Sequence, residues 1–90
     1  MKYRKERIGE LLKEIISKEI AKSPDFDGGL ITIMEVLVED KLDKARVIVQ
    51  VYPDEIKYAA LVRLNRKAKE FEYLILKSTF LKKSPHLVFE

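Results

Sequence analysis

The hydrophobic residues of this 90-residue chain change their spacing twice along the sequence, and this change constrains the fold more than any other feature. Over residues 4–22 they recur every three or four positions, which is the period of an amphipathic helix. Over residues 30–39 and 45–52 they alternate, as in strands that bury one face. From residue 55 the helical period returns. The sequence therefore predicts an α+β domain with a strand pair between helical segments.

The connections define the order of the elements. The two predicted strands form an antiparallel hairpin, because only the polar turn Asp40–Lys44 joins them. The helical pattern over residues 55–77 is long for a chain of this size, so we expect a bend at Asn65–Ala68, where Asn is a weak helix former. A short last strand follows at Leu87–Phe89. The predicted order is α-β-β-α-α-β with a three-stranded sheet, in a single domain over residues 1–90.

Prolines and aromatic residues complete this prediction. Ser23-Pro24 ends the first helix, because Pro disfavours the α conformation of the residue before it. The spacing of Met34 predicts a core position for it, as for Phe71 and Phe89. Tyr3, Tyr52, Tyr58 and Tyr73 are candidates for stacking on bases, but they are scattered. We expect Tyr52 and Tyr73 to bury their rings in the core instead.

The composition argues against catalysis. The chain has no Cys, which excludes disulfides, thiolate metal sites and a cysteine nucleophile. Its one His, His86, has no Ser–Asp arrangement beside it and is expected on the surface. Asp40 and Asp43 alternate with lysines, so they are interpreted as turn formers rather than as ligands for Mg²⁺. We predict that the protein is not an enzyme and has no metal site, no cofactor and no small-molecule substrate.

The same sequence suggests a cytoplasmic protein. No apolar run approaches the roughly 20 residues that a membrane span needs. Residues 1–22 carry charges throughout and lack the apolar core of a signal peptide. The absence of Cys suits a reducing compartment. We therefore expect a cytoplasmic protein with no membrane association.

The net charge of +3 conceals an uneven distribution. Residues 1–22 carry seven Lys or Arg and four Glu, and residues 61–90 carry seven Lys or Arg and three Glu. Between them, residues 23–60 carry four Lys or Arg and eight Asp or Glu. This arrangement is expected if one face of the molecule meets a polyanion, although a solvated surface of mixed charge would give the same counts.

Several short motifs occur in a fixed order along nearly the whole chain. They are the helix Arg4-Lys5-Glu6-Arg7-Ile8-Gly9-Glu10-Leu11, the strand Leu30-Ile31-Thr32-Ile33-Met34-Glu35-Val36, the hairpin residues Leu42, Ala45 and Val47, the helix end Leu64-Asn65-Arg66-Lys67-Ala68, and the closing Leu81, Pro85, Leu87 and Phe89. No single motif is specific, but in this order they resemble the ribosome-binding factor A family. The resemblance implies a type II KH-like fold with the element order given above.

The resemblance also implies a function. Such a protein is expected to be a monomeric, non-catalytic assembly factor that binds the free or immature 30S ribosomal subunit through 16S rRNA. It would aid late rRNA processing and maturation. An alternative stays open, because the same small fold could serve as a protein–protein interaction module whose basic face binds an acidic partner.

Two positions depart from the family pattern. Lys41 stands before Leu42 where the family usually has Asp. Glu70 follows Ala68-Lys69 where the family has the Gly of an Ala-x-Gly kink between two helices. Glu favours helix over a kink with positive φ. We therefore expect no close approach of backbone to RNA at this turn.

The predicted RNA-binding residues are cations, because affinity for RNA depends on neutralising phosphates. One group surrounds the predicted bend and a second continues toward the last strand, with a third on the first helix. These residues are Arg63, Arg66, Lys67, Lys69, Lys77, Lys82, Lys83, Arg4 and Arg7, with Lys5 beside the last two. Each residue singly is also consistent with a solvated surface cation.

Overall fold

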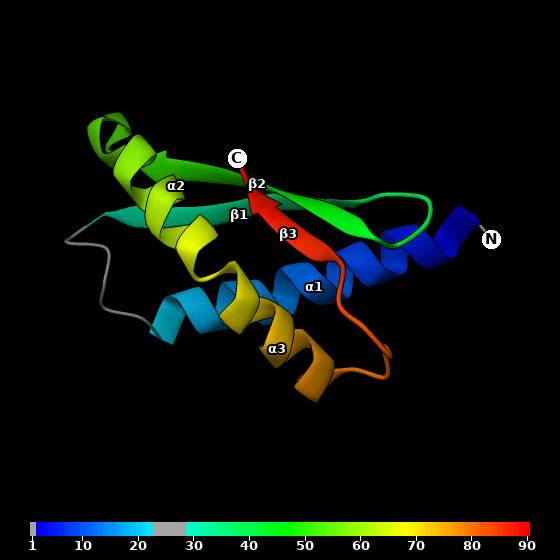
Figure 1. Cartoon of the computed structure of the whole chain (residues 1–90). Helices are drawn as coiled ribbons and strands as arrows, with labels where there is room; N and C mark the ends of the chain where they lie inside the picture. Colours follow the sequence, from blue (N-terminus) through cyan, green and yellow to red (C-terminus); the bar gives the residue numbers. More distant parts are fainter. Residues whose placement is uncertain (1, 23–28) are drawn as a thin grey trace.

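The computed structural model describes residues 2–22 and 29–90, and Figure 1 shows the arrangement of its elements. The predicted helix end at Ser23-Pro24 lies outside the described residues. The elements are α1 (Lys2–Lys22), β1 (Leu30–Val38), β2 (Lys44–Tyr52), the 3-10 helix η1 (Asp54–Ile56), α2 (Lys57–Arg66), α3 (Ala68–Ser78) and β3 (His86–Phe89). The predicted order of helices and strands is confirmed, and the long helical pattern is interrupted within the expected segment.

The sheet has the order β1-β2-β3. β1 and β2 are antiparallel, as expected for a hairpin, and β3 runs parallel to β2 along its other side. The register shifts between Ile33 and Glu35, so Met34 is an extra residue in β1. This bulge lets both Ile33 and Val38 face the core, although five positions separate them.

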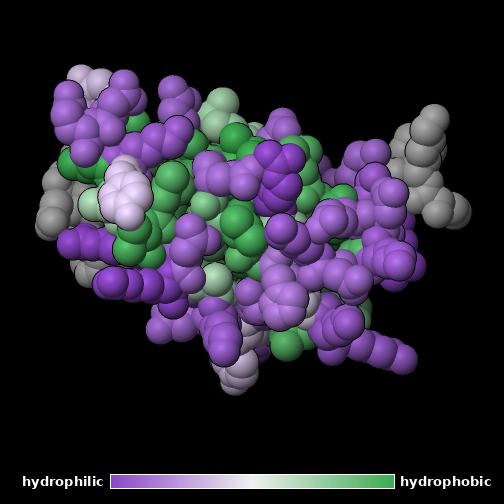
Figure 2. Space-filling model, turned by 45° about the horizontal axis from the view of Figure 1, so that its top comes forward, coloured by the Kyte–Doolittle hydropathy of each residue, from purple (hydrophilic) through white to green (hydrophobic). Residues whose placement is uncertain are grey.

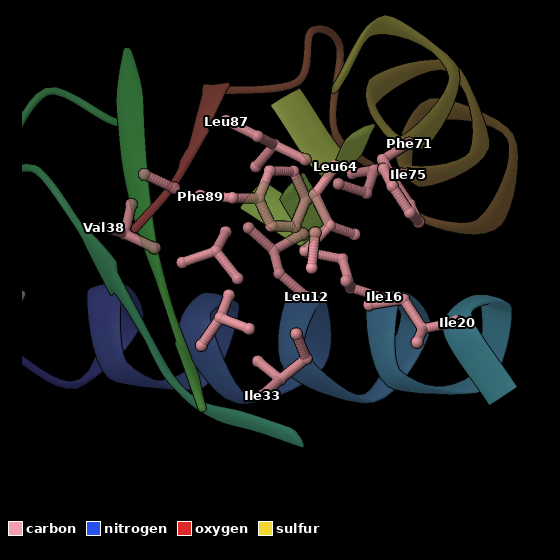
Figure 3. Close-up of a cluster of buried hydrophobic side chains, with 14 of the residues drawn as sticks. Leu12, Ile16, Ile20, Ile33, Val38, Leu64, Phe71, Ile75, Leu87 and Phe89 are labelled. Carbon is pink, nitrogen blue, oxygen red and sulfur yellow. The ribbon is translucent and has the colours of Figure 1, made fainter. Parts of the chain in front are cut away.

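All three helices supply buried side chains to the core on one face of the sheet (Figure 3). The most completely buried of the larger side chains are Leu12, Ile16, Leu64, Ile75, Val47 and Pro85. Phe71 on α3 and Phe89 on β3 are buried with ring centroids 5.4 Å apart and ring planes inclined by 49°. Tilted aromatic pairs at this separation are favourable beyond the area that they bury. The last strand is thus packed directly against α3.

Two expectations about the core are wrong. Met34 is 48% exposed, because the bulge places it on the open face of the sheet. Tyr52 and Tyr73 are 73% and 69% exposed. Tyr73 lies two residues after the buried Phe71, and two residues of helix rotate a side chain by roughly 200°, onto the opposite face. The rings of both tyrosines therefore point toward solvent.

The face of the sheet opposite the helices carries exposed apolar side chains, among them Leu30, Met34, Leu37 and Tyr52. Figure 2 shows the molecule with the top of Figure 1 turned forward, and hydrophobic residues gather in the middle of this view inside a hydrophilic border. An antiparallel hairpin can keep one face solvated, as here. The sheet therefore has one face in the core and one open face.

Gly9 permits a close approach of α1 to the sheet. A Cβ atom at this position would lie 2.7 Å from the carbonyl oxygen of Val36, a backbone atom that follows the bulge in β1. Carbon and oxygen atoms do not approach this closely without a shift of the backbone. The glycine is therefore required by packing, in the middle of a helix where its conformational freedom is otherwise unfavourable.

We expect Gly9→Ala to destabilise the protein, by about 1–3 kcal/mol as for other overpacked sites. In an isolated helix the same change would stabilise by up to about 1 kcal/mol, so the sign of the effect reports the contact with Val36. Urea unfolding measures the difference. Glu10→Ala, at an exposed position of the same helix, is the control. Equal or greater stability of the Gly9 variant would show that α1 does not depend on this contact.

Candidate nucleic-acid interface

The predicted cations fall into two groups on the structure. Arg63, Arg66, Lys67 and Lys69, here called the kink cations, surround the junction between α2 and α3. Arg4, Lys82 and Lys83 meet at the far end of the molecule, around a separate cavity. Arg7 and Lys77 are exposed, but they line neither this cavity nor the one at the kink. The predicted cations therefore do not form one continuous group.

The junction between α2 and α3 consists of one residue, Lys67, with φ −91° and ψ 4°. Its N–H donates to the carbonyl of Arg63 at 3.1 Å, and its carbonyl accepts from the N–H of Phe71 at 3.1 Å. Both bonds have helical spacing, so the chain bends without leaving the helical pattern on either side. Glu70 lies inside α3, as its helical preference predicts. The bend does not use a positive φ at this residue.

Asn65 explains why the bend lies here. Its side chain leaves the helix surface and binds the backbone of Phe89, the last residue of β3. The amide nitrogen Nδ2 donates to the carbonyl oxygen of Phe89 at 3.0 Å, and Oδ1 accepts from its N–H at 2.9 Å. Nδ2 also donates to the carbonyl oxygen of Leu61 at 3.0 Å. Asn65 therefore supplies the donor and the acceptor that a neighbouring strand would offer to Phe89.

Glu72 makes a similar contact on the other side of the bend. Its carboxylate oxygen Oε2 accepts from the N–H of Leu87 at 3.1 Å, and its Oε1 lies 3.7 Å from Nδ1 of His86. Leu87 and Phe89 turn their backbone groups away from β2, because β3 is the last strand of the sheet. Side chains of α2 and α3 thus cover this edge, which would otherwise be open to pairing with another chain. The contacts fix both helices relative to the sheet.

A cavity of about 250 Å³ lies beside the kink, between the end of α1 and the start of α3. Its lining combines one kink cation, Lys67, with the carboxylates Glu19 and Glu70 and an apolar wall that includes Phe71 and Tyr73. Two carboxylates beside one ammonium group disfavour a phosphate in this cavity. The expectation that RNA does not approach the backbone closely at the kink is consistent with this lining.

A second cavity, of about 360 Å³, lies between the start of α1, the β1–β2 turn and the connection from α3 to β3. We call it the turn cavity. It is lined by Arg4, Ile8, Lys41, Leu42, Phe80, Leu81, Lys82, Lys83 and Pro85. Lys41 and Phe80 were not among the residues selected from the sequence. They are distant from each other and from Arg4 along the chain, so no local pattern marks them as neighbours.

Two ion pairs join the β1–β2 turn to the other segments that line the turn cavity, which are α1 and the connection from α3 to β3. Nζ of Lys5 on α1 lies 2.6 Å from Oδ1 of Asp40, and Nζ of Lys83 lies 3.9 Å from Oδ1 of Asp43. The hydrogen bond from Lys5 and its positive charge lower the pKa of the Asp40 carboxyl below its ordinary value of 3.8. The same contact raises the pKa of Lys5 above 10.5. Asp40 and Asp43, which we expected only to form the turn, also join it to α1 and to the connection from α3 to β3.

No group of three or more His, Cys, Asp or Glu side chains among residues 2–22 and 29–90 is arranged to hold a metal ion. In the same part of the chain, no helix is long and apolar enough to cross a membrane. The geometry described so far thus consists of two groups of cations, two cavities and one open sheet face.

Comparisons with known proteins agree with the motifs. The family model described as Ribosome-binding factor A matches residues 4–90. Ribosome-binding factor A from Akkermansia muciniphila is 28% identical over 89 residues, which cover 99% of this chain and 71% of that protein.

Solved structures show the same fold. The crystal structure of ribosome-binding factor A from Thermus thermophilus superposes with a TM-score of 0.83 at 22% identity, covering 96% of this chain and 92% of that one. A homology model of Thermus thermophilus ribosome-binding factor A, fitted into a cryo-EM map of its complex with the 30S subunit, gives a TM-score of 0.74 at 22% identity, covering 90% of this chain and 87% of that one. The predicted α+β class, element order and KH-like architecture are confirmed.

Asn65→Ala should destabilise the protein by about 1–3 kcal/mol, because it leaves the N–H and the carbonyl of Phe89 without their partner. It should also increase hydrogen exchange at the Phe89 amide. Urea unfolding and exchange monitored by NMR measure the two effects. Arg66→Ala is the control, since Arg66 is the exposed next residue of the same helix. An unchanged exchange rate at Phe89 would contradict the role assigned to Asn65.

The Lys5–Asp40 pair predicts a pH dependence with a defined sign. The lowered pKa of Asp40 means that its contribution to stability is present above pH 4 and is lost as the pH falls through the folded-state pKa. The difference in stability between wild type and Asp40→Asn should therefore shrink below about pH 4. An NMR titration of the Asp40 carboxyl gives the midpoint directly. Lys5→Ala should return that midpoint toward 3.8, and failure to do so would assign the shift to another group.

Proposed function

The chain belongs to the ribosome-binding factor A family, and on this premise we propose that it binds the free or immature 30S ribosomal subunit through 16S rRNA. We propose further that it acts as a single, monomeric domain in the cytoplasm and aids late rRNA processing and maturation. It would do so without catalysing a reaction and without a cofactor. The observation that carries this proposal is the match of the family model over residues 4–90.

The distribution of positive charge supports RNA as the contacted component. Arg66 and Lys67 follow Arg63 by three and four residues, so both lie near it, Arg66 on α2 and Lys67 at the junction with α3. The turn cavity adds a second group of cations at the other end of the domain. Two groups of cations at a distance can contact phosphates of two RNA segments and so fix the orientation of the protein.

A factor of this kind can act through binding alone. It shifts an equilibrium between rRNA conformations only if it binds one of them more tightly than the other. A domain that prefers an arrangement found in the precursor would stabilise it, and would leave when mature contacts replace that arrangement. The contacts of β3 with Asn65 and Glu72 support this mechanism, since they hold the two helices in one geometry.

One observation favours a protein partner as the alternative. The open face of the sheet exposes Leu30, Met34, Leu37 and Tyr52, and exposed apolar patches often mark interaction sites. The two possibilities differ in their dependence on salt, because contacts with phosphates weaken steeply as salt rises. Sedimentation with free 30S subunits, whole ribosomes and naked rRNA at two salt concentrations separates them. Failure to associate with any of the three at low salt would contradict the proposed function.

The triple variant Arg63→Glu, Arg66→Glu and Lys67→Glu should lose association with 30S subunits and remain folded, because it reverses three charges at the proposed contact. A second triple variant, Lys18→Glu, Lys44→Glu and Lys57→Glu, changes the net charge equally at exposed positions on α1, on β2 and at the start of α2, and is the matched control. It should associate nearly as wild type does. Equal binding by the two variants would show that the kink cations do not form the contact.

A further inference from the structure

We propose that the turn cavity holds one unstacked nucleotide of a single-stranded RNA, with its base on the ring of Phe80 and its phosphates on Arg4, Lys41 and Lys82. The inference rests on the proposed binding of rRNA and names a second place where that binding occurs. It concerns the end of the molecule away from the junction of α2 and α3.

The cavity is formed by three segments that are far apart in the sequence. Arg4 and Ile8 come from α1, Lys41 and Leu42 from the β1–β2 turn, and residues 80–85 from the connection between α3 and β3. Figure 1 shows these segments at the same end of the molecule, near the N-terminus. A volume of about 360 Å³ is within the range that proteins use for small ligands, and one nucleotide is of this size.

Positive charge predominates around the cavity. Its lining includes four cations and no carboxylate. Asp43 is near Lys83, but no carboxylate of the described residues pairs with Arg4, Lys41 or Lys82. Three cations without a counter-ion around one cavity repel each other, and an anionic ligand relieves that repulsion. This charge distribution is the reverse of that in the cavity beside the kink, where two carboxylates lie beside Lys67.

Phe80 lies at this cavity with its side chain fully exposed, at 106% of the reference area. The hydroxyl of Thr79 fixes this orientation, since Oγ1 donates to the carbonyl of Ile75 at 2.8 Å and accepts from the N–H of Leu81 at 3.2 Å. The turn directs Leu81 toward the core and Phe80 toward solvent. An aromatic ring held in solvent beside several cations is the arrangement with which proteins bind single strands.

The β1–β2 turn is constrained in the same way. Leu42 has a φ of 60°, in the left-handed region that non-glycine residues rarely adopt. Its side chain nonetheless packs against the core and lines the cavity. The Lys5–Asp40 pair joins this turn to α1. Together these contacts hold the turn that carries Lys41 at the cavity.

A single strand is the form of RNA that this geometry fits. Stacking on Phe80 requires a base whose face is free, and in a duplex the faces are covered by neighbouring base pairs. The cations come from three separate segments that line the same cavity as the ring, so we expect them to contact the phosphates on both sides of one nucleotide. A free mononucleotide would use only part of this charge.

The test measures the affinity of a fluorescently labelled single-stranded RNA hexamer by anisotropy. Phe80→Ala should weaken binding by about 10- to 100-fold, which is the range for loss of one base–aromatic contact. Phe80→Tyr should bind nearly as wild type, because it keeps the ring. Lys41→Ala should weaken binding and lower its dependence on salt. The control is Tyr58→Ala, which removes a ring that is 80% exposed on α2, outside the cavity, and should bind as wild type does.

Three results of the direct binding measurements would overturn the proposal. They are equal binding by Phe80→Ala and wild type, binding of a blunt RNA duplex as tight as that of the hexamer, and binding of uridine monophosphate as tight as that of the hexamer. Equal competition by polyglutamate would also overturn it, in favour of an acidic protein partner. These results are independent of the 30S sedimentation experiment. If the protein associates with 30S subunits and Phe80→Ala does not change hexamer binding, only the nucleotide site in the turn cavity is rejected. If the protein does not associate with subunits and Phe80→Ala weakens hexamer binding, only the proposed function is rejected.

Discussion

The contact between Asn65 and Phe89 is the interaction on which the rest of the structure depends. One side chain satisfies both the N–H and the carbonyl of Phe89, at 2.9 Å and 3.0 Å, on an edge of the sheet that would otherwise be unpaired. Because Phe89 also packs on Phe71, the same residue joins α2, β3 and α3. Glu72 completes the edge through the N–H of Leu87. The angle between the two helices is therefore determined by the last strand and not by the local sequence alone.

This dependence separates what the sequence predicts from what it does not. Hydrophobic spacing is a local property, so the helices, the hairpin and the position of the bend could all be predicted. The bend was expected at Asn65 because Asn is a weak helix former, whereas its side chain holds the bend by binding a strand 24 residues away. Met34 was assigned to the core because regular alternation does not foresee a bulge. Local patterns give the elements, and contacts between elements give their geometry.

The site was less predictable for the same reason. The sequence indicates which segments are basic, and most of the selected cations are exposed. It does not indicate that Lys41 and Phe80 lie at one cavity with Arg4, because 39 residues separate Lys41 from Phe80 and 37 separate Arg4 from Lys41. Nor does it show that Glu19 lies with Glu70 beside Lys67. The groupings of residues at both cavities depend on how α1 crosses the sheet. Gly9 permits this crossing, because it can lie close to Val36.

The two ends of the domain differ in the kind of contact that they can make. At the kink, carboxylates lie within the same cavity as Lys67, so a phosphate close to the backbone is opposed, and the kink cations are suited to contacts from the outer surface of the helices. At the turn cavity, three cations that pair with no carboxylate of the described residues lie with an exposed ring, so a phosphate and a base can both enter. Contacts of the first kind supply affinity that any RNA would share, whereas the second requires a nucleotide that is free of its neighbours. If both proposed contacts form, the domain would prefer RNA in which a single strand lies at a fixed distance from a second segment. Such a preference is the property that a factor acting through binding alone needs in order to favour one rRNA conformation over another.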